Sequence, residues 1–439
     1  MSAINFLKNK SNIFVISAAK WSLIGQFTQR ILNLSLTIIL ARIFLPEEYG
    51  KFYYLIGTLA FMVQLIGLSI RSISIRNVSF LFSKNIESCQ KYIYSSLFIG
   101  LSLSLFGLVF LNILMSFFSE SYIVNDYGLQ LLFFVFLAII SEIYYGLTLG
   151  ILEGLQLFKN LNLLTIIIVF LKFNFTILAS YFYGLNIGLI AWVSSSLVGS
   201  IITLLFLKRA LLLKHLNIKG ININECKSEI KLFIKYSLPS TIELSILLLI
   251  MWLIKTNIYS TGEIGKAKIA AFNIANQWKS LAIYIPAIFI NMLQSFFSSS
   301  YGSNDSGKIK YLYKNVKKFT VILSIIITIT TLIFSDYIIL IFGRGYNEAS
   351  FILSILIVPT ILLTINSLNR QLLISMGKVK FIALNNSFCA LLMFLFYFIL
   401  VYFDIDILVS FSISIVINEV MVYLINFIYI KKFKLISSL

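Results

Sequence analysis

Nine charged side chains within the apolar stretches of this sequence are candidates for function: Arg30, Arg71, Glu142, Lys172, Glu243, Lys255, Lys279, Arg370 and Glu419. An Arg, Lys or Asp at the bilayer centre costs about 2.5–3.5 kcal/mol on insertion scales, so such groups should face a protein interior or a watery cavity. Six of the nine are basic and three are acidic, and this imbalance favours an anionic guest over a closed network of ion pairs. The sequence therefore predicts a hydrated, positively charged cavity inside a membrane protein.

The basic members of this set are the candidate substrate-binding residues. Arg30, Lys172 and Lys279 lie about two or more helical turns from either end of their apolar stretches, so they are too deep to reach the interface by snorkelling. Arg71 and Arg370 lie toward the predicted cytoplasmic ends and either contact substrate, snorkel or bind lipid phosphate. We expect the first three to line the cavity and keep the other two as candidates.

The acidic members have two possible roles that the sequence leaves open. Glu142, Glu243 and Glu419 either neutralise neighbouring cations or take up protons during a transport cycle, which makes them ion-coupling candidates. We expect no metal site, because the three cysteines show no paired spacing and the chain has one histidine.

The candidate catalytic and nucleotide-binding motifs in this sequence are incomplete. The only histidine, His215, lies in a basic linker, so no Ser-His-Asp or Cys-His set can form in the membrane. The segment from Gly302 to Lys308 resembles a phosphate-binding loop, but Ile309 stands where a Ser or Thr is required. Asp404 and Asp406 resemble the metal-binding pair of some glycosyltransferases but occupy a short turn. We therefore expect neither an enzyme, nor a cofactor, nor ATP as the fuel.

The composition requires lipid as the solvent of this chain. It is 59% hydrophobic and 12% charged with a mean hydropathy of +0.95, so it cannot cover a soluble globule with polar surface. A helix needs about 20 apolar residues to cross a bilayer. Twelve such stretches predict an all-α polytopic membrane protein: Ile13–Leu40, Phe52–Ile75, Tyr92–Phe118, Leu129–Leu152, Leu161–Tyr183, Leu185–Leu207, Tyr236–Tyr259, Ile269–Phe297, Phe319–Ile341, Ala349–Ile374, Phe381–Phe403 and Ile405–Ile430. Pro286 and Pro359 fall inside the eighth and tenth and predict bends there.

The segments between these stretches alternate between rich and poor in Lys and Arg. With the N-terminus inside, the cytoplasmic segments hold 24 of the 35 basic residues, whereas the outward turns hold only Arg42, Lys51, Lys266, Lys268 and Arg344. Basic residues near span ends set orientation, so both termini are predicted to be cytoplasmic. The net charge of +18 then reflects orientation and attraction to anionic lipid headgroups, and we expect no nucleic-acid partner.

The chain divides near its middle into two similar halves. We expect a six-helix bundle over 1–207, a basic cytoplasmic linker over 208–235 and a second bundle over 236–439. The residues from Glu48 to Lys51 recur as those from Glu263 to Lys266, at an offset of 215 residues. With six spans each, the repeats enter the membrane in the same direction and enclose a site between them. The alternative is a chance similarity of short glycine-containing turns.

Two short segments resemble a known family. The segment LARIFLPEEYGKF, from Leu40 to Phe52, resembles the signature of bacterial polysaccharide exporters. These form the O-antigen (Wzx-type) flippase branch of the multidrug/oligosaccharidyl-lipid/polysaccharide exporter (MOP) superfamily. The stretch from Ala271 to Trp278, followed by Pro286, is similar to the eighth helix of that family. The resemblance implies a MATE-like fold of two pseudo-symmetric six-helix bundles around a V-shaped cavity.

The same resemblance implies a function. The protein would flip undecaprenyl-pyrophosphate-linked O-antigen or capsule repeat units from the cytoplasmic to the outer leaflet of the bacterial inner membrane, by alternating access coupled to H⁺ or Na⁺. A polysaccharide polymerase and a chain-length regulator are the implied protein partners, beside membrane lipids. Arg30, Arg71 and Lys279 lie on helices where related flippases keep basic residues. A pyrophosphate headgroup needs such basic partners away from bulk water.

Two rival functions stay open. A drug/cation antiporter of the same superfamily would share the fold, but its cavity should be acidic or apolar, and the basic surplus counts against it. A membrane-embedded polysaccharide polymerase or glycosyltransferase normally carries a large outward loop, and all six outward segments here are short.

Overall fold

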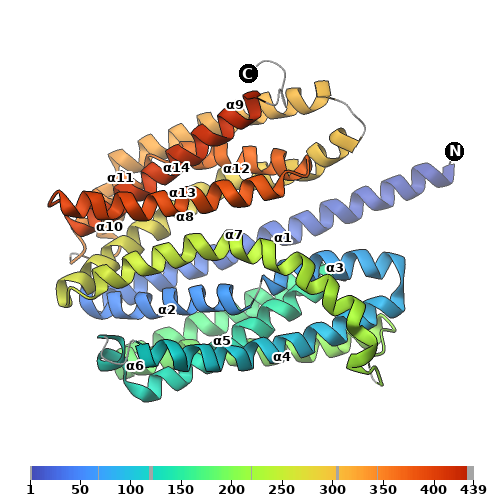
Figure 1. Ribbon diagram of the computed structural model, residues 1–439, viewed down its shortest axis with the longest axis horizontal. Helices are drawn as coiled ribbons and strands as arrows, with labels where there is room; N and C mark the ends of the chain where they lie inside the picture. Colours follow the sequence, from blue (N-terminus) through green and yellow to red (C-terminus); the bar gives the residue numbers. More distant parts are fainter. Residues whose placement is uncertain are drawn as a thin grey trace. The chain divides into compact units, whose positions relative to one another are not determined.

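A computed structural model describes residues 2–67, 69–117, 122–218, 220–302, 306–343 and 345–432. Within these ranges the chain is almost entirely helical and contains no strand. The helices follow one another as shown in Figure 1: α1 (Ser2–Ile43), α2 (Pro46–Ile66), α3 (Ile70–Lys84), α4 (Ile86–Phe117), α5 (Tyr122–Gly154), α6 (Phe158–Leu213), η1 (Ile223–Cys226), α7 (Lys227–Tyr259), α8 (Glu263–Gly302), α9 (Ser306–Ile333), α10 (Ser335–Leu340), α11 (Glu348–Ile357), α12 (Thr360–Ser375), α13 (Val379–Tyr402) and α14 (Ile407–Lys432).

The expected fold class, an all-α polytopic membrane protein, is confirmed. Six helices among the described residues are long and apolar enough to cross a membrane, or eight if each of two bent pairs forms one span. Every one of the twelve predicted stretches falls on a helix or on a pair of consecutive helices. The sequence segment from Gly302 to Lys308 lies partly outside the described residues.

The chain forms two compact units. Unit 1 comprises Met1–Ile43 and Thr58–Thr241, and unit 2 comprises Phe44–Gly57 and Ile242–Leu439. Helices α2 and α7 therefore each contribute residues to both units. Relative to the bundles expected from the sequence, Phe44–Gly57 belongs to the second unit, and residues 208–241 belong to the first.

In unit 1, the long helix α6 is a hairpin of two spans. It has 56 residues, or about 84 Å at 1.5 Å per residue, which is far more than the ~30 Å of a hydrocarbon core. Gly184 breaks it with φ 79° and ψ −167°, a conformation essentially limited to glycine. Lys172 Nζ, before the break, donates a 2.7 Å hydrogen bond to Ser196 Oγ, after it, so the two arms pack against each other.

In unit 2, Pro359 breaks the tenth predicted stretch as expected. It precedes the first residue of α12, and α11 and α12 meet at 41°. Pro286, by contrast, lies inside α8 without ending it. Helix α12 packs on α8, α9 and α14, and α13 packs on α14.

The segment Phe44–Gly57 is fixed in unit 2 by buried aromatic side chains. Tyr54 stacks on Tyr259 with ring centroids 4.1 Å apart, and its hydroxyl lies 2.9 Å from that of Thr256. Asn273 Nδ2 donates a hydrogen bond of 3.2 Å to the Tyr49 hydroxyl. The motif that carries the sequence resemblance is thus a packing element.

The Asp404 and Asp406 pair forms part of a helix start. Asp406 Oδ1 accepts hydrogen bonds from the backbone N–H groups of Leu408 (2.9 Å) and Val409 (3.3 Å), which caps α14. Burial alone would raise the pKa of Asp406, but the hydrogen bond from Lys268 and those two backbone donors hold it below its ordinary value. The position therefore has a structural role in this turn.

Candidate functional site

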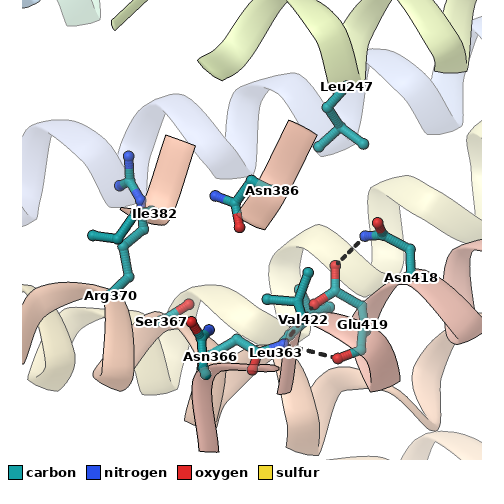
Figure 2. Close-up of a pocket in the computed structure, with 11 residues that line it drawn as sticks. Leu247, Leu363, Asn366, Ser367, Arg370, Ile382, Asn386, Asn418, Glu419 and Val422 are labelled. Atoms are coloured by element: carbon teal, nitrogen blue, oxygen red, sulfur yellow. Dashed lines mark hydrogen bonds between the residues drawn. The ribbon is translucent and has the colours of Figure 1, made fainter. Parts of the chain in front are cut away.

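The candidate site is a cavity of about 170 Å³ inside unit 2. Asparagine, serine, arginine and glutamate side chains from α12, α13 and α14 supply its polar lining, and Leu247 of α7 lies at its edge (Figure 2). Residues spaced one turn apart share a helix face, which brings Asn366 and Arg370 of α12 into the same cavity. On α14 the same spacing brings in Asn418, Val422 and Asn426, with Glu419 beside them.

Glu419 is the acidic group of this cavity, and amide groups hold it. Asn366 Nδ2 donates 3.0 Å hydrogen bonds to both Oε2 and the backbone carbonyl of Glu419. Asn418 Nδ2 lies 3.4 Å from Oε1. Figure 2 shows the carboxylate between these amides. Hydrogen bonds to an ionised carboxylate contribute about 1.5–3 kcal/mol each, so the two amides fix the direction of this side chain.

Two amide oxygens beside the carboxylate have no hydrogen-bond partner among the described residues. They are Oδ1 of Asn366 and Oδ1 of Asn418, in side chains that are 7% and 6% exposed. An acceptor left unsatisfied away from water costs about 1–3 kcal/mol, so a guest with donors or positive charge is favoured here. The carboxylate and these oxygens together form an acceptor-rich pocket.

Lys279 lies near Glu419, and Lys255 lies near Lys279, in the same unit. Lys279 of α8 is buried, at 8% exposed, and is within electrostatic range of Glu419. Lys255 of α7 interacts electrostatically with Lys279, and its Nζ lies 5.2 Å from the centre of the Phe272 ring. Lys279 therefore offsets part of the negative charge of Glu419.

Arg370 also lines the cavity, and in Figure 2 it lies across the cavity from Glu419. Amide contacts extend from this region along α13 and α14, where Asn385 Nδ2 donates a 3.1 Å hydrogen bond to Asn426 Oδ1. The cavity therefore combines one carboxylate, one guanidinium and several amides.

In unit 1, the predicted residues Lys172 and Glu142 form a pair. Lys172 Nζ lies 3.4 Å from Glu142 Oε1 and 2.7 Å from Ser196 Oγ, which in turn donates to Glu142 Oε1 at 2.9 Å. The same Nζ lies 3.3 Å from the centre of the Trp192 ring. The carboxylate, hydroxyl and aromatic ring together compensate this cation.

Two further predicted residues, Arg71 and Arg30, lie in unit 1. Arg71 of α3 is half exposed and pairs with Glu153 of α5 at 3.3 Å. Arg30 is exposed on α1. Glu243 lies on α7 in unit 2, but its side chain is outside what the structure describes.

The asparagines are the functional residues that sequence reasoning missed. Asn366, Asn386, Asn418 and Asn426 line the cavity, yet attention to ionisable groups passed over them. A signal was present, because polar amides in membrane helices are costly unless they are hydrogen-bonded or face water.

The chain is similar to known proteins in sequence and in fold. Residues 239–399 match the MatE family. A multidrug resistance MATE family transporter of the MOP superfamily in an inward-facing conformation has a TM-score of 0.76 at 16% identity, covering 93% of this chain and 95% of that one. An outward-facing structure of the same description has a TM-score of 0.67 at 17% identity, covering 97% and 96%.

A third similar structure is described as a MOP superfamily transporter from Pyrococcus furiosus, with a binding pocket of reverse polarity that suggests a different function. It has a TM-score of 0.67 at 16% identity, covering 95% of each chain. No curated protein matches the sequence. These similarities establish the two-lobed, twelve-helix MATE fold over nearly the whole chain.

The expected membership of the O-antigen flippase branch is corrected by these matches. The matching family is MatE, and similar structures are multidrug resistance transporters. The expected lipid-linked oligosaccharide substrate, and with it the polymerase and the chain-length regulator as partners, is likewise unsupported. The alternative from the sequence, a drug/cation antiporter of the same superfamily, has the better support.

Two physical reasons explain the error. From Phe44 onward, the motif that ends at Phe52 belongs to unit 2, where Tyr49 and Phe52 are fully buried. Its residues therefore serve packing and contain little information about the substrate. The basic surplus was also overcounted. Arg71 is paired with Glu153, which was not counted, and Lys172 is paired with Glu142.

Proposed function

We propose that this protein is an ion-coupled antiporter that exports small organic cations, with Glu419 as the carboxylate that the coupling ion and the organic cation occupy in turn. The observation that carries the proposal is the acceptor-rich pocket around Glu419, where two buried amide oxygens have no hydrogen-bond partner among the described residues. The MATE fold supports transport as the class of function.

The chemistry of exchange follows from the charges around this carboxylate. A buried carboxylate in a membrane protein requires a compensating positive charge. Lys279 supplies part of that positive charge from a distance. The charge of Glu419 is therefore partly compensated in the interval between the release of one cation and the entry of the other. Because one site cannot hold both cations at once, entry of either favours release of the other, which is the basis of antiport.

Either H⁺ or Na⁺ fits as the coupling ion. A proton would neutralise the carboxylate, whereas Na⁺ would use the carboxylate together with amide oxygens, since hard cations bind oxygen ligands. Glu243 of α7 stays a second prediction as an ion-coupling residue. Contact of Arg30, Arg71, Lys172, Lys279 and Arg370 with substrate stays a prediction from the sequence for an anionic guest, apart from this proposal. We further propose the bacterial inner membrane as the location.

Efflux from proteoliposomes tests the proposal. Vesicles loaded with a fluorescent organic cation such as ethidium should empty faster under an imposed H⁺ or Na⁺ gradient, and applying each gradient separately identifies the ion. Glu419→Gln should abolish this acceleration, because Gln cannot supply the negative charge.

Arg370→Gln is the matched control, since Arg370 lines the same cavity with the opposite charge. Removing a positive charge should leave cation efflux intact or increase it. Gradient-independent efflux in the wild-type protein, or full acceleration in Glu419→Gln at equal reconstitution, would refute the proposal.

A further inference from the structure

The first turns of α7 have one buried face and one basic face. Cys226, just before the helix, and Glu229 and Phe233 within it are 0%, 8% and 1% exposed. At 100° per residue, these three positions share one side of the helix. This side packs into unit 1 and anchors the start of the helix.

The opposite side carries lysines and isoleucines in alternation. Lys227, Lys231 and Lys235 follow at intervals of four residues, with Ile230 and Ile234 between them. These five residues span an arc of about 140° on the helical wheel. They line an open groove, all three lysines are exposed, and Ile234 is 47% exposed. We call this set the basic stripe.

The length of α7 places the basic stripe at the depth of lipid headgroups. Its 33 residues extend about 50 Å, whereas the hydrocarbon core is about 30 Å thick. The apolar part of the helix includes Ser245–Tyr259 at its far end. The surplus length therefore falls on the stripe, which precedes the apolar part.

Two acidic residues lie at the start of α7, and neither of them lines the groove of the basic stripe. Glu229 lies on the buried face, where Ser228 Oγ donates to its carboxylate at 2.7 Å. Glu225 lies in η1, before the helix. The groove thus carries three lysines beside an apolar strip, which complements a molecule with an anionic head and an apolar tail.

We propose that the basic stripe binds an anionic phospholipid, with its phosphate among Lys227, Lys231 and Lys235 and an acyl chain along Ile230 and Ile234. The inference does not depend on the transported substrate. Clustered lysines at a membrane surface attract anionic lipids, and each contributes about a fivefold preference. The exposed isoleucines distinguish this groove from a merely charged surface.

Lipid retention by the purified full-length chain tests the proposal. The delipidated protein is titrated in detergent with phosphatidylglycerol or with phosphatidylcholine, and bound lipid is counted by native mass spectrometry. The wild-type protein should retain phosphatidylglycerol preferentially, and less so at high salt. The variant Lys227→Gln/Lys231→Gln/Lys235→Gln should lose about a hundredfold of that preference.

The chain offers a control with the same charge and spacing. Lys310, Lys314 and Lys318 on α9 also follow at intervals of four, but the residues between them are the buried Tyr313 and the charged Lys317. Their triple Gln variant should keep the preference. Ile230→Ser/Ile234→Ser should weaken retention although every lysine remains.

Three outcomes would overturn the proposal. They are no preference in the wild-type protein, full preference in the α7 lysine variant, and an equal loss in the α9 control, which would show a dependence on net charge alone. Unchanged elution of each variant in size-exclusion chromatography confirms that a lost preference is not a folding defect.

Discussion

Two partly buried carboxylates in membrane helices have different surroundings in this protein. Glu142 accepts hydrogen bonds from both Lys172 and Ser196. Its charge is therefore neutralised by a lysine of the protein itself, which cannot exchange with a mobile cation. Glu419 is held by amides, and a lysine acts on it only at longer range. This contrast is why we assign ion coupling to Glu419 and a structural role to Glu142.

The structural role of the Lys172 and Glu142 pair leads to a stability prediction. Lys172→Gln or Glu142→Gln should each lower the free energy of unfolding by about 3–5 kcal/mol, because a partly buried charge is left alone. The double variant should recover most of this loss. Unfolding in detergent, followed by circular dichroism, measures all three.

One outcome of this unfolding experiment would contradict the pairing of Lys172 with Glu142. If the double variant is as unstable as the sum of the two singles, the side chains do not act as a pair. Cation efflux in the stable double variant should stay near the wild-type rate, since the proposed exchange takes place at Glu419.

At this scale the sequence revealed the charges but could not show their pairing. Arg71 and Glu153 are 82 positions apart, and only the packing of α3 on α5 brings them to 3.3 Å. Asn366 and Asn418 were not predicted, because nothing local in the sequence shows that an amide faces a cavity and a carboxylate.

At the scale of elements, α2 packs closely against α8. Gly50 lies so close to the backbone carbonyl of Lys266 that a Cβ would overlap it, whereas a Cβ at Gly57 would have nothing within 4 Å. These two glycines stand on the same helix, so they form a matched pair for mutation.

Gly50→Ala should destabilise unit 2 by about 1–3 kcal/mol, because overpacking forces the backbones apart. Gly57→Ala should be neutral or stabilising by up to about 1 kcal/mol, since alanine is the better helix former. Thermal unfolding of both variants in the same detergent provides the measurement. Equal stability of the two variants would contradict the close approach.

Breaks in the helices were predictable where proline causes them. Pro359 separates α11 from α12, as expected. The break between α2 and α3 lies beside Gly67 and Ser69, and Ser69 has a positive φ of 53° that no local motif predicts. Helix positions follow from hydrophobicity, but such breaks depend on tertiary packing.

At the scale of the whole molecule, the topology stays a prediction from charge. A reporter active only outside the cytoplasm should be silent when fused at His215 and active when fused at Gly262, because Lys and Arg accumulate on the cytoplasmic side. Fusion at a matched set of turns provides the measurement. The reverse pattern would contradict the predicted orientation.

The fold could be predicted over nearly the whole chain, whereas the substrate could not. Long apolar helices leave few alternatives, and the similarity to MATE transporters covers 93% of the chain. The substrate depends on the net charge of a small cavity, and that charge depends on which distant side chains neutralise one another. Counting basic residues along the sequence therefore led to an anionic guest.

Exchange of an organic cation for an ion through Glu419 is the central claim, and counterflow measures it most directly. Proteoliposomes receive a gradient of ethidium with no imposed ion gradient, and the movement of H⁺ and of ²²Na⁺ is followed. We predict that one of these ions moves against the flow of ethidium in the wild-type protein, and that Glu419→Gln shows no such movement. Ethidium flux without ion counterflow, or undiminished counterflow in Glu419→Gln, would contradict the account.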